Sequence, residues 1–141
     1  MKEIAIGCDH AGFTLKEKLS ALLKEMNYTV KDVGCYSDQS VDYPDFGHQV
    51  AKTIEKNTEK KGIVICGSGN GINMSVNKHS KVRGALCWNK EIAELARLHN
   101  DANILALPAR YLSYEEAEQI VKTFLNTSFE GGRHQRRIDK I

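Results

Sequence analysis

The stretch that decides the fold is Gly62-Ile63-Val64-Ile65-Cys66-Gly67-Ser68-Gly69-Asn70-Gly71. Its first half is a continuous apolar run rich in β-branched residues, which is typical of a parallel strand covered on both faces. Its second half alternates glycine with small polar residues, which indicates a tight turn from that strand into a helix. The stretch therefore predicts a strand, a loop and a helix in an α/β protein.

The alternation of strand and helix continues in both directions from this unit. Apolar residues at helical spacing, with lysine and glutamate between them, indicate helices, and short apolar runs indicate strands. Pro44 suits the first turn of a helix. The expected strands cover residues 2–8, 28–33, 62–66, 82–87 and 102–107, and the expected helices cover residues 13–26, 44–60, 90–98 and 114–125, with one more after the glycine loop.

Strands that alternate with helices predict a parallel sheet with helices on both faces, because parallel neighbours need right-handed crossover connections. We expect one α/β domain over residues 1–141, a Rossmann-like, doubly wound, three-layer sandwich with a five-stranded parallel sheet in the order 2-1-3-4-5. Ligands of such folds bind outside the carboxyl ends of the strands. Asp9 and His10, after the first strand, would face residues 66–71 there.

The overall composition is that of an ordinary globular protein, with 41% hydrophobic and 27% charged residues. A net charge of +2 gives no reason to expect nucleic acid or a membrane surface as a partner. The sequence predicts neither a membrane span nor a signal peptide. The four cysteines show no zinc-type spacing, so a reducing cytoplasm and no metal are expected.

The exception to this even charge lies near the C-terminus. Residues 130–141 carry five basic side chains, counting His134, against two carboxylates. Two interpretations stay open at this point. The segment is either a solvated terminal helix or a docking site for one small anion.

Spacing excludes three familiar anion-binding chemistries for the glycine loop. A Walker loop needs Gly-Lys followed by Ser or Thr, which the chain lacks, and a dinucleotide loop needs G-x-G-x-x-G rather than G-x-G-x-G. A cysteine phosphatase would have an arginine six positions after Cys66, where this chain has Ile72. The remaining interpretations are a loop whose N–H groups hold an oxyanion beside a thiol, or a turn without a ligand.

Cys66 differs from the other cysteines in its position. It ends a buried strand beside the glycine loop, where backbone N–H groups and the following helix favour a thiolate. We therefore expect Cys66 to act as a base or nucleophile. Cys8, Cys35 and Cys87 are expected to be small core residues.

Two histidines are candidates for acid–base chemistry near neutral pH. His10 and His99 are both predicted to lie in loops at the carboxyl edge of the sheet, where such a group is well placed to act. His48, inside a predicted helix, and His79, in a polar stretch, are expected to have no catalytic role.

Taken together, the motifs along the chain resemble the ribose-5-phosphate isomerase B family, which groups with galactose-6-phosphate isomerase subunits. The resemblance spans nearly the whole chain. Its carriers are Gly7-Cys8-Asp9-His10-Ala11-Gly12, Asp42-Tyr43-Pro44, Cys66-Gly67-Ser68-Gly69-Asn70-Gly71, Asn77-Lys78, Arg97-Leu98-His99-Asn100-Asp101-Ala102-Asn103 and Glu130-Gly131-Gly132-Arg133-His134-Gln135-Arg136-Arg137.

This resemblance implies a role for each matching residue. Cys66 is the implied proton-abstracting base and His99 the implied acid that opens the sugar ring; in the mechanism that we expect from these roles, Ser68 shuttles a proton. Some family members use a glutamate after the glycine loop as base, but Ile72 occupies that position here. The resemblance further implies substrate contacts from Asp9, His10, Tyr43, Gly67, Gly69, Asn70, Gly71 and Asn100, and a phosphate site formed by Arg110, Arg133, His134 and Arg137.

The resemblance also implies an activity and an assembly. The activity is interconversion of ribose 5-phosphate and ribulose 5-phosphate through a cis-enediolate, without a metal or other cofactor. The assembly is a homodimer, often paired into a tetramer, in which residues 128–141 reach a neighbouring subunit. Alternatives are a hexose 6-phosphate substrate (allose or galactose) and a non-catalytic phosphosugar-binding subunit. A flavodoxin-like or receiver domain is disfavoured by the loop that follows the first strand.

Overall fold

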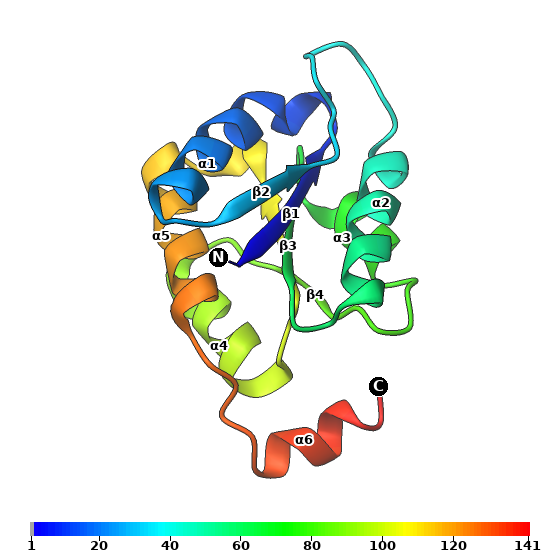
Figure 1. The fold of residues 1–141 in the computed structure, drawn as a ribbon, viewed down its shortest axis with the longest axis vertical. Coiled ribbons are helices and arrows are strands. Elements are labelled where there is room, and N and C mark those ends of the chain that lie inside the picture. Colours follow the sequence, from blue (N-terminus) through cyan, green and yellow to red (C-terminus); the bar gives the residue numbers. More distant parts are fainter. Residues whose placement is uncertain (1) are drawn as a thin grey trace.

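The computed structural model describes residues 2–141 and confirms the alternation of strands and helices (Figure 1). Two short 3-10 turns, η1 (His10–Gly12) and η2 (Ala109–Tyr111), follow the first and last strands. The strands are β1 (Glu3–Cys8), β2 (Thr29–Asp32), β3 (Lys61–Cys66), β4 (Gly84–Leu86) and β5 (Ile104–Pro108), and the helices are α1 (Phe13–Glu25), α2 (Tyr43–Lys56), α3 (Asn70–Val76), α4 (Lys90–Asn100), α5 (Tyr114–Asn126) and α6 (Arg133–Ile138).

All five strands pair in parallel in a single sheet with the order β2-β1-β3-β5-β4. The predicted fold class and the pairing of β1 with β3 are confirmed. The predicted order of the last two strands is wrong, because β5 lies inside the sheet and β4 forms its edge. Every residue of β5 is buried, whereas the three residues of β4 are all partly exposed. The longer, wholly apolar run thus takes the position that helices cover on both faces.

Side chains alternate between the two faces of the sheet and give it two hydrophobic layers. On β3, Ile63 and Ile65 pack in the core beneath α1, α4 and α5. Val64 and Cys66 point the opposite way, into the core beneath α2 and α3. This alternation confirms the predicted three-layer sandwich, and it orients Cys66 toward α2 and α3.

Because the strands are parallel, they all begin at one end of the sheet, here called the amino edge, and all finish at the other, the carboxyl edge. The loops that follow β1, β3 and β5 lie at the carboxyl edge, whereas the end of α4 and the C-terminal segment lie at the amino edge. Figure 1 shows α6 beyond the amino edge, at the bottom of the view, far from the chain that follows β2 at the top. The backbone N–H of Glu130 donates to the carbonyl of Leu98 and ties the start of this segment to α4. Among residues 2–141, no helix has the length and hydropathy that a membrane span requires.

Candidate active site

The glycine loop at the carboxyl edge is held in shape by contacts that exclude larger residues. Gly69 has a φ of +76°, and a Cβ atom there would lie 2.5 Å from Leu86 Cδ1 and 3.1 Å from the carbonyl carbon of Leu107. The N–H of Asn70 donates to the hydroxyl oxygen of Ser68 at 3.3 Å. Among the hydrogen bonds of residues 2–141, none has the N–H of Gly67, Ser68 or Gly69 as its donor. Three backbone donors beside Cys66 therefore have no hydrogen-bond partner among the described residues.

Two longer side chains flank this loop at close range. A Cβ atom at Gly71 would lie 2.5 Å from Cζ of Tyr43, the first residue of α2. A Cβ atom at Gly67 would lie 3.0 Å from Nη1 of Arg110. The backbone N–H of Arg110 donates to the Gly67 carbonyl at 3.0 Å. Tyr43, expected to contact the substrate, and Arg110, expected at the phosphate end, are thus both brought beside the loop within one chain.

Asp9 and His10 complete the carboxyl edge from the end of β1. Asp9 is 6% exposed, and its carboxylate accepts the N–H groups of Ala11 and Gly12 at 3.0 and 3.3 Å. His10 Nδ1 accepts the N–H of Val41 at 3.1 Å, so a neutral His10 carries its proton on Nε2. Because β1 pairs with β3, both residues lie beside the glycine loop, as the sequence predicts.

All four cysteines are free and buried, so burial does not distinguish Cys66 from the others. Burial raises the pKa of Cys87 to about 12. It also raises the pKa of Cys8, whose Sγ lies 3.8 Å from Sγ of Cys35. The prediction that these three are core residues is confirmed. Cys66 alone ends its strand against the loop with the free N–H donors.

His99 lies at the opposite edge of the sheet, and its predicted place in a carboxyl-edge loop is wrong. It belongs to the last turn of α4, which runs on to Asn100 and ends at Asp101 in the left-handed conformation. Four residues separate His99 from Ile104, where β5 begins beside Gly62, whereas Cys66 pairs with Pro108 at the far end of β5. From Ile104 to Pro108 the strand advances by four residues, which corresponds to roughly 13 Å.

His99 forms a compact group with two residues of the C-terminal segment. Its ring stacks on that of His134, with centroids 4.3 Å apart and planes 17° from parallel. Oε2 of Glu130 lies 3.9 Å from Nε2 of His99 and 3.6 Å from Nε2 of His134. Burial, with the positive charge on His99 and Arg133, lowers the pKa of His134. His134 is therefore held mainly in its neutral form near neutral pH.

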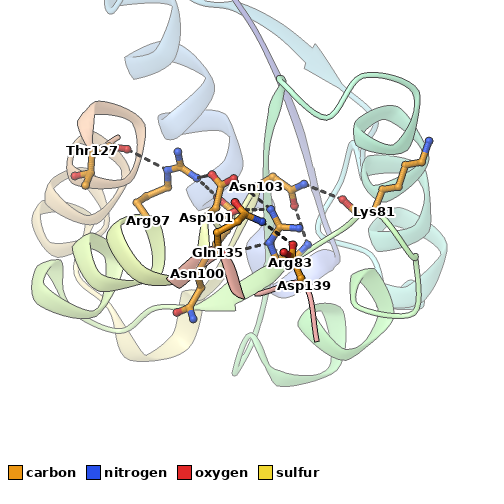
Figure 2. Close-up of polar contacts among 10 residues, drawn as sticks. Lys81, Arg83, Arg97, Asn100, Asp101, Asn103, Thr127, Gln135 and Asp139 are labelled. Carbon is orange, nitrogen blue, oxygen red and sulfur yellow. Dashed lines mark hydrogen bonds and ion pairs between the residues drawn. The ribbon is translucent and has the colours of Figure 1, made fainter. Parts of the chain in front are cut away.

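The turn that carries His99 is fixed by arginines whose role the sequence analysis missed (Figure 2). Arg97 is 6% exposed and donates to the carbonyls of Ala102 and Thr127 and to the Asp101 carboxylate. Arg83 donates to the carbonyls of Asn100 and Asp101 at 2.9 and 3.0 Å. These bonds satisfy carbonyls at the end of α4. The motif around His99 already contains Arg97, but nothing in its spacing identifies the partners.

The residues expected around the phosphate are divided between the two edges. Arg110 lies at the carboxyl edge, whereas Arg133 and Arg137 extend from α6 with exposed side chains, and Asn100 ends α4 nearby. A single chain therefore does not bring together the predicted base, ring-opening acid and phosphate site.

Surface cavities follow the same division. One of about 340 Å³ adjoins the glycine loop and is lined by Ser68, Asn70, Leu86, Trp88, Pro108 and Tyr111. A larger one, of about 990 Å³, lies at the amino edge and includes Arg83, Arg97 and Asp101 but no predicted catalytic residue. We regard the smaller cavity as the relevant one, because it adjoins the free N–H donors.

Comparison with known proteins identifies the family to which this chain belongs. The family model described as Ribose/Galactose Isomerase matches residues 4–141. Ribose-5-phosphate isomerase B of Escherichia coli is 43% identical over 141 residues, which cover 100% of this chain and 95% of that protein. The probable ribose-5-phosphate isomerase B of Mycoplasma genitalium is 48% identical over 140 residues, which cover 98% and 92%.

Solved structures agree with these relatives. Ribose-5-phosphate isomerase B of Clostridium thermocellum superposes with a TM-score of 0.96 at 46% identity, covering 98% of this chain and 93% of the other. The Mycoplasma genitalium enzyme with bound ribulose-5-phosphate gives a TM-score of 0.95 at 47% identity, covering 98% and 92%. This chain belongs to the ribose/galactose isomerase family and is an aldose–ketose isomerase.

Proposed function

We propose that this isomerase interconverts ribose 5-phosphate and ribulose 5-phosphate at a site formed by two copies of the chain. The observation that carries the proposal is the set of three unused N–H donors beside Cys66, a site suited to the oxyanion of an enediolate. The relatives named above as ribose-5-phosphate isomerases, one of them with bound ribulose-5-phosphate, support a pentose phosphate as substrate.

The proposed reaction begins with opening of the furanose ring. His99 of a second copy delivers a proton to the ring oxygen, the bond from C1 to that oxygen breaks, and the C1 hydroxyl releases its proton to solvent as the free aldehyde forms. The Cys66 thiolate then removes the proton from C2 and leaves a cis-enediolate, whose negative oxygen accepts the N–H groups of the loop. Loss of one such donor typically costs about 10²–10³-fold in rate.

The second half of the reaction returns the proton. Cys66 delivers it to C1, while Ser68 moves a proton between O1 and O2, and ribulose 5-phosphate results. The mechanism needs no metal, because the N–H donors supply the stabilisation that a cation gives elsewhere. Asp9, His10, Tyr43 and Asn70 lie where they can bind the sugar hydroxyls.

The phosphate is assigned to arginines, whose planar fork matches phosphate oxygens. Arg133 and Arg137 are exposed, and among residues 2–141 neither forms an ion pair. Both therefore remain free to clamp an anion, together with His134 and with Arg110 of the other copy. Anchoring at this remote group orients the reacting carbons.

A shared site explains why each edge of the sheet is incomplete on its own. In the proposed homodimer, α6 and His99 of one copy face the glycine loop of its partner. Residues 128–141 of each copy therefore reach across the interface. Large apolar side chains near the loop support this arrangement, since Met74, Trp88 and Tyr111 are 67%, 54% and 75% exposed. Residues 1–141 then act as one domain, and dimers are proposed to pair into tetramers. Four free thiols suit a reducing compartment, so we place the enzyme in the cytoplasm.

Ketose formation tests the proposed substrate. The purified protein is incubated separately with ribose 5-phosphate, allose 6-phosphate and galactose 6-phosphate, each with and without a chelator. We expect turnover of ribose 5-phosphate to exceed the other two. Faster turnover of either hexose phosphate would contradict the pentose assignment, silence on all three would contradict the substrate class, and loss of activity with the chelator would contradict the metal-free mechanism.

Substitution of Cys66 tests the proposed base. We expect Cys66→Ala to retain the fold, as judged by circular dichroism, and to lose turnover. The matched control is Cys87→Ala, which removes an equally buried thiol outside the loop and is expected to keep turnover. Full activity in Cys66→Ala would remove the central step of the mechanism.

A further inference from the structure

The group formed by His99, Glu130 and His134 has the chemistry of a metal site, although the proposed isomerisation uses His99 only as an acid and His134 only at the phosphate. Each residue offers one donor atom, and the three donor atoms all lie within 4.8 Å of one another. Two imidazoles and one carboxylate are a common ligand set for zinc in proteins. Among residues 2–141, this is the one cluster of at least three such side chains close enough to share an ion.

The buried nitrogen of His134 points to a missing ligand. His134 is 6% exposed, and its Nε2 atom has no hydrogen-bond partner among the described residues. Its nearest polar neighbour is Glu130 Oε2 at 3.6 Å, which is too long for a hydrogen bond. A buried polar atom left in this way is costly and rare, so an occupant between Nε2 and Glu130 would satisfy it.

We propose that His99, Glu130 and His134 bind one divalent transition-metal ion, with zinc as the representative, and that the bound ion reversibly inhibits the isomerase. The inhibition rests on the proposed function, because it acts by occupying the nitrogen that His99 uses to open the sugar ring. Binding itself does not depend on that function. The ion is an inhibitor in this scheme and takes no part in turnover.

The geometry needs only movements that the exposed members of the cluster permit. Zinc–nitrogen and zinc–oxygen bonds of about 2.0–2.2 Å place tetrahedral ligand atoms about 3.3 Å apart. The observed separations from Glu130 Oε2 are 3.6 and 3.9 Å, so modest contraction suffices there. The rings lie 17° from parallel, so His99 must tilt to aim its lone pair at the ion. The side chains of His99 and Glu130 are 40% and 49% exposed and free to move, while His134 stays fixed.

Ligand type and local charge set the expected selectivity and strength. Nitrogen donors favour zinc, nickel and copper ions over magnesium and calcium ions, which prefer oxygen. Arg133 and Arg137 on the same short helix repel a cation, whereas the Glu130 carboxylate attracts it. We therefore expect weaker binding than at a structural zinc site with four protein ligands.

Direct titration tests the metal site. The full-length, metal-free protein competes with a chromophoric chelator for added Zn²⁺, and we expect one ion per chain. Glu130→Gln and His99→Gln should each weaken binding at least tenfold, and both positions are exposed enough for the variants to fold. Unchanged affinity in both variants would overturn the proposal.

Controls separate this cluster from the other metal-binding side chains. His48, His79 and Glu55 form the second histidine group, with His79 Nδ1 at 2.7 Å from Glu55 Oε1 and His48 Nδ1 at 2.8 Å from His79 Nε2. His79→Gln and Cys66→Ala should bind Zn²⁺ as the unchanged protein does. Loss of binding in either variant would move the site away from His134 and overturn the proposal.

Inhibition is measured in the same protein with ribose 5-phosphate as substrate. Zn²⁺ should lower turnover over the concentration range in which it binds, EDTA should restore the rate, and Mg²⁺ should have no effect. The Zn²⁺ concentration for half-inhibition should rise in Glu130→Gln in parallel with its weaker binding. Binding without inhibition would overturn the inhibitory role, whereas absence of turnover without metal would contradict the proposed function and leave the titration to decide the site.

Discussion

The two edges of the sheet are built by different means and offer different chemistry. At the carboxyl edge, backbone constraints at Gly69 and Gly71 shape a loop that presents a thiol and unused N–H donors. At the amino edge, side-chain hydrogen bonds from Arg97 fix the turn that presents His99 beside the arginines of α6. One edge can stabilise a negative oxygen and the other can supply protons and hold phosphate. The comparison teaches that neither edge is a complete site.

The largest expected effect comes from mixing two inactive variants. Cys66→Ala and His99→Asn should each reduce kcat/KM by at least about 100-fold, the usual loss when a general acid or base is removed. If each site uses Cys66 of one copy and His99 of the other, a heterodimer keeps one intact site. Random reassortment of equal amounts should then restore about a quarter of the full activity.

Co-expression with two different affinity tags provides the measurement, because the heterodimer can be isolated and assayed. The matched control mixes Cys66→Ala with Ser68→Ala, two changes at the same edge. If the edge is contributed whole by one copy, each site of that heterodimer carries one of the two changes, so no recovery is expected. A heterodimer of unchanged protein with a chain that carries both Cys66→Ala and His99→Asn should be inactive, because each of its two sites then contains one altered residue. No recovery with Cys66→Ala and His99→Asn on separate chains would break the shared-site model.

The next largest effect concerns the architecture of the amino edge. Arg97→Met should lower the free energy of unfolding by about 3 kcal/mol, because it leaves two carbonyls without a charged donor and removes the nearer of the two arginines that contact the Asp101 carboxylate. Arg83→Met should cost only about 1 kcal/mol, since the Arg83 side chain is 29% exposed and water can replace its bonds. Urea denaturation measures both values. Equal losses of unfolding free energy in the two variants would show that the burial of each arginine does not determine its contribution to stability.

A smaller effect is expected from the arginines of α6. Arg137→Ala should raise KM for ribose 5-phosphate about 10- to 100-fold and change kcat less, because charge-assisted bonds to phosphate contribute about 1.5–3 kcal/mol. Arg136→Ala is the matched control on the same helix, and it should leave KM within about twofold. Steady-state kinetics distinguishes the two positions, and equal effects would show that α6 contributes only its overall charge.

The smallest effect is expected from the N-terminal cap of α5, which lies shortly after Arg110 in the chain. Ser113 caps α5 by accepting the N–H of Glu116 at 3.1 Å, while the Glu116 carboxylate accepts the N–H of Ser113 at 2.9 Å. Ser113→Ala should lower the free energy of unfolding by about 1 kcal/mol without changing KM. A change in KM would show that the cap also positions Arg110 for the substrate.

The sequence predicted the fold well because the relevant information is local. The apolar run of β3, the helical spacing of α1 and α5, and the glycine loop each specify their own element. The strand order was not predicted correctly, because pairing of β5 with β3 depends on which strand fits the doubly covered position. Only the relative burial of β4 and β5 shows that difference.

The candidate site was predictable at one edge and not at the other. Asp9, His10 and Cys66 follow strands that pair directly, so topology alone brings them together. His99 was misplaced because its motif was assigned to a loop, whereas α4 extends through it and returns the chain to the amino edge. The contact with Glu130 and His134 joins residues more than thirty positions apart, and no spacing rule predicts it.

The position of β4 at the edge has a consequence for the order in which the chain acquires its structure during translation. β1, β2 and β3 can pair as they leave the ribosome, since β2 and β3 each find β1 already made. β4 is synthesised next but pairs only with β5, so it must wait until residues 104–108 have emerged. At typical synthesis speeds that delay is roughly one to a few seconds. During this interval β3 is an edge strand of the partly formed sheet. When β5 emerges, it pairs with both β3 and β4 and completes the sheet.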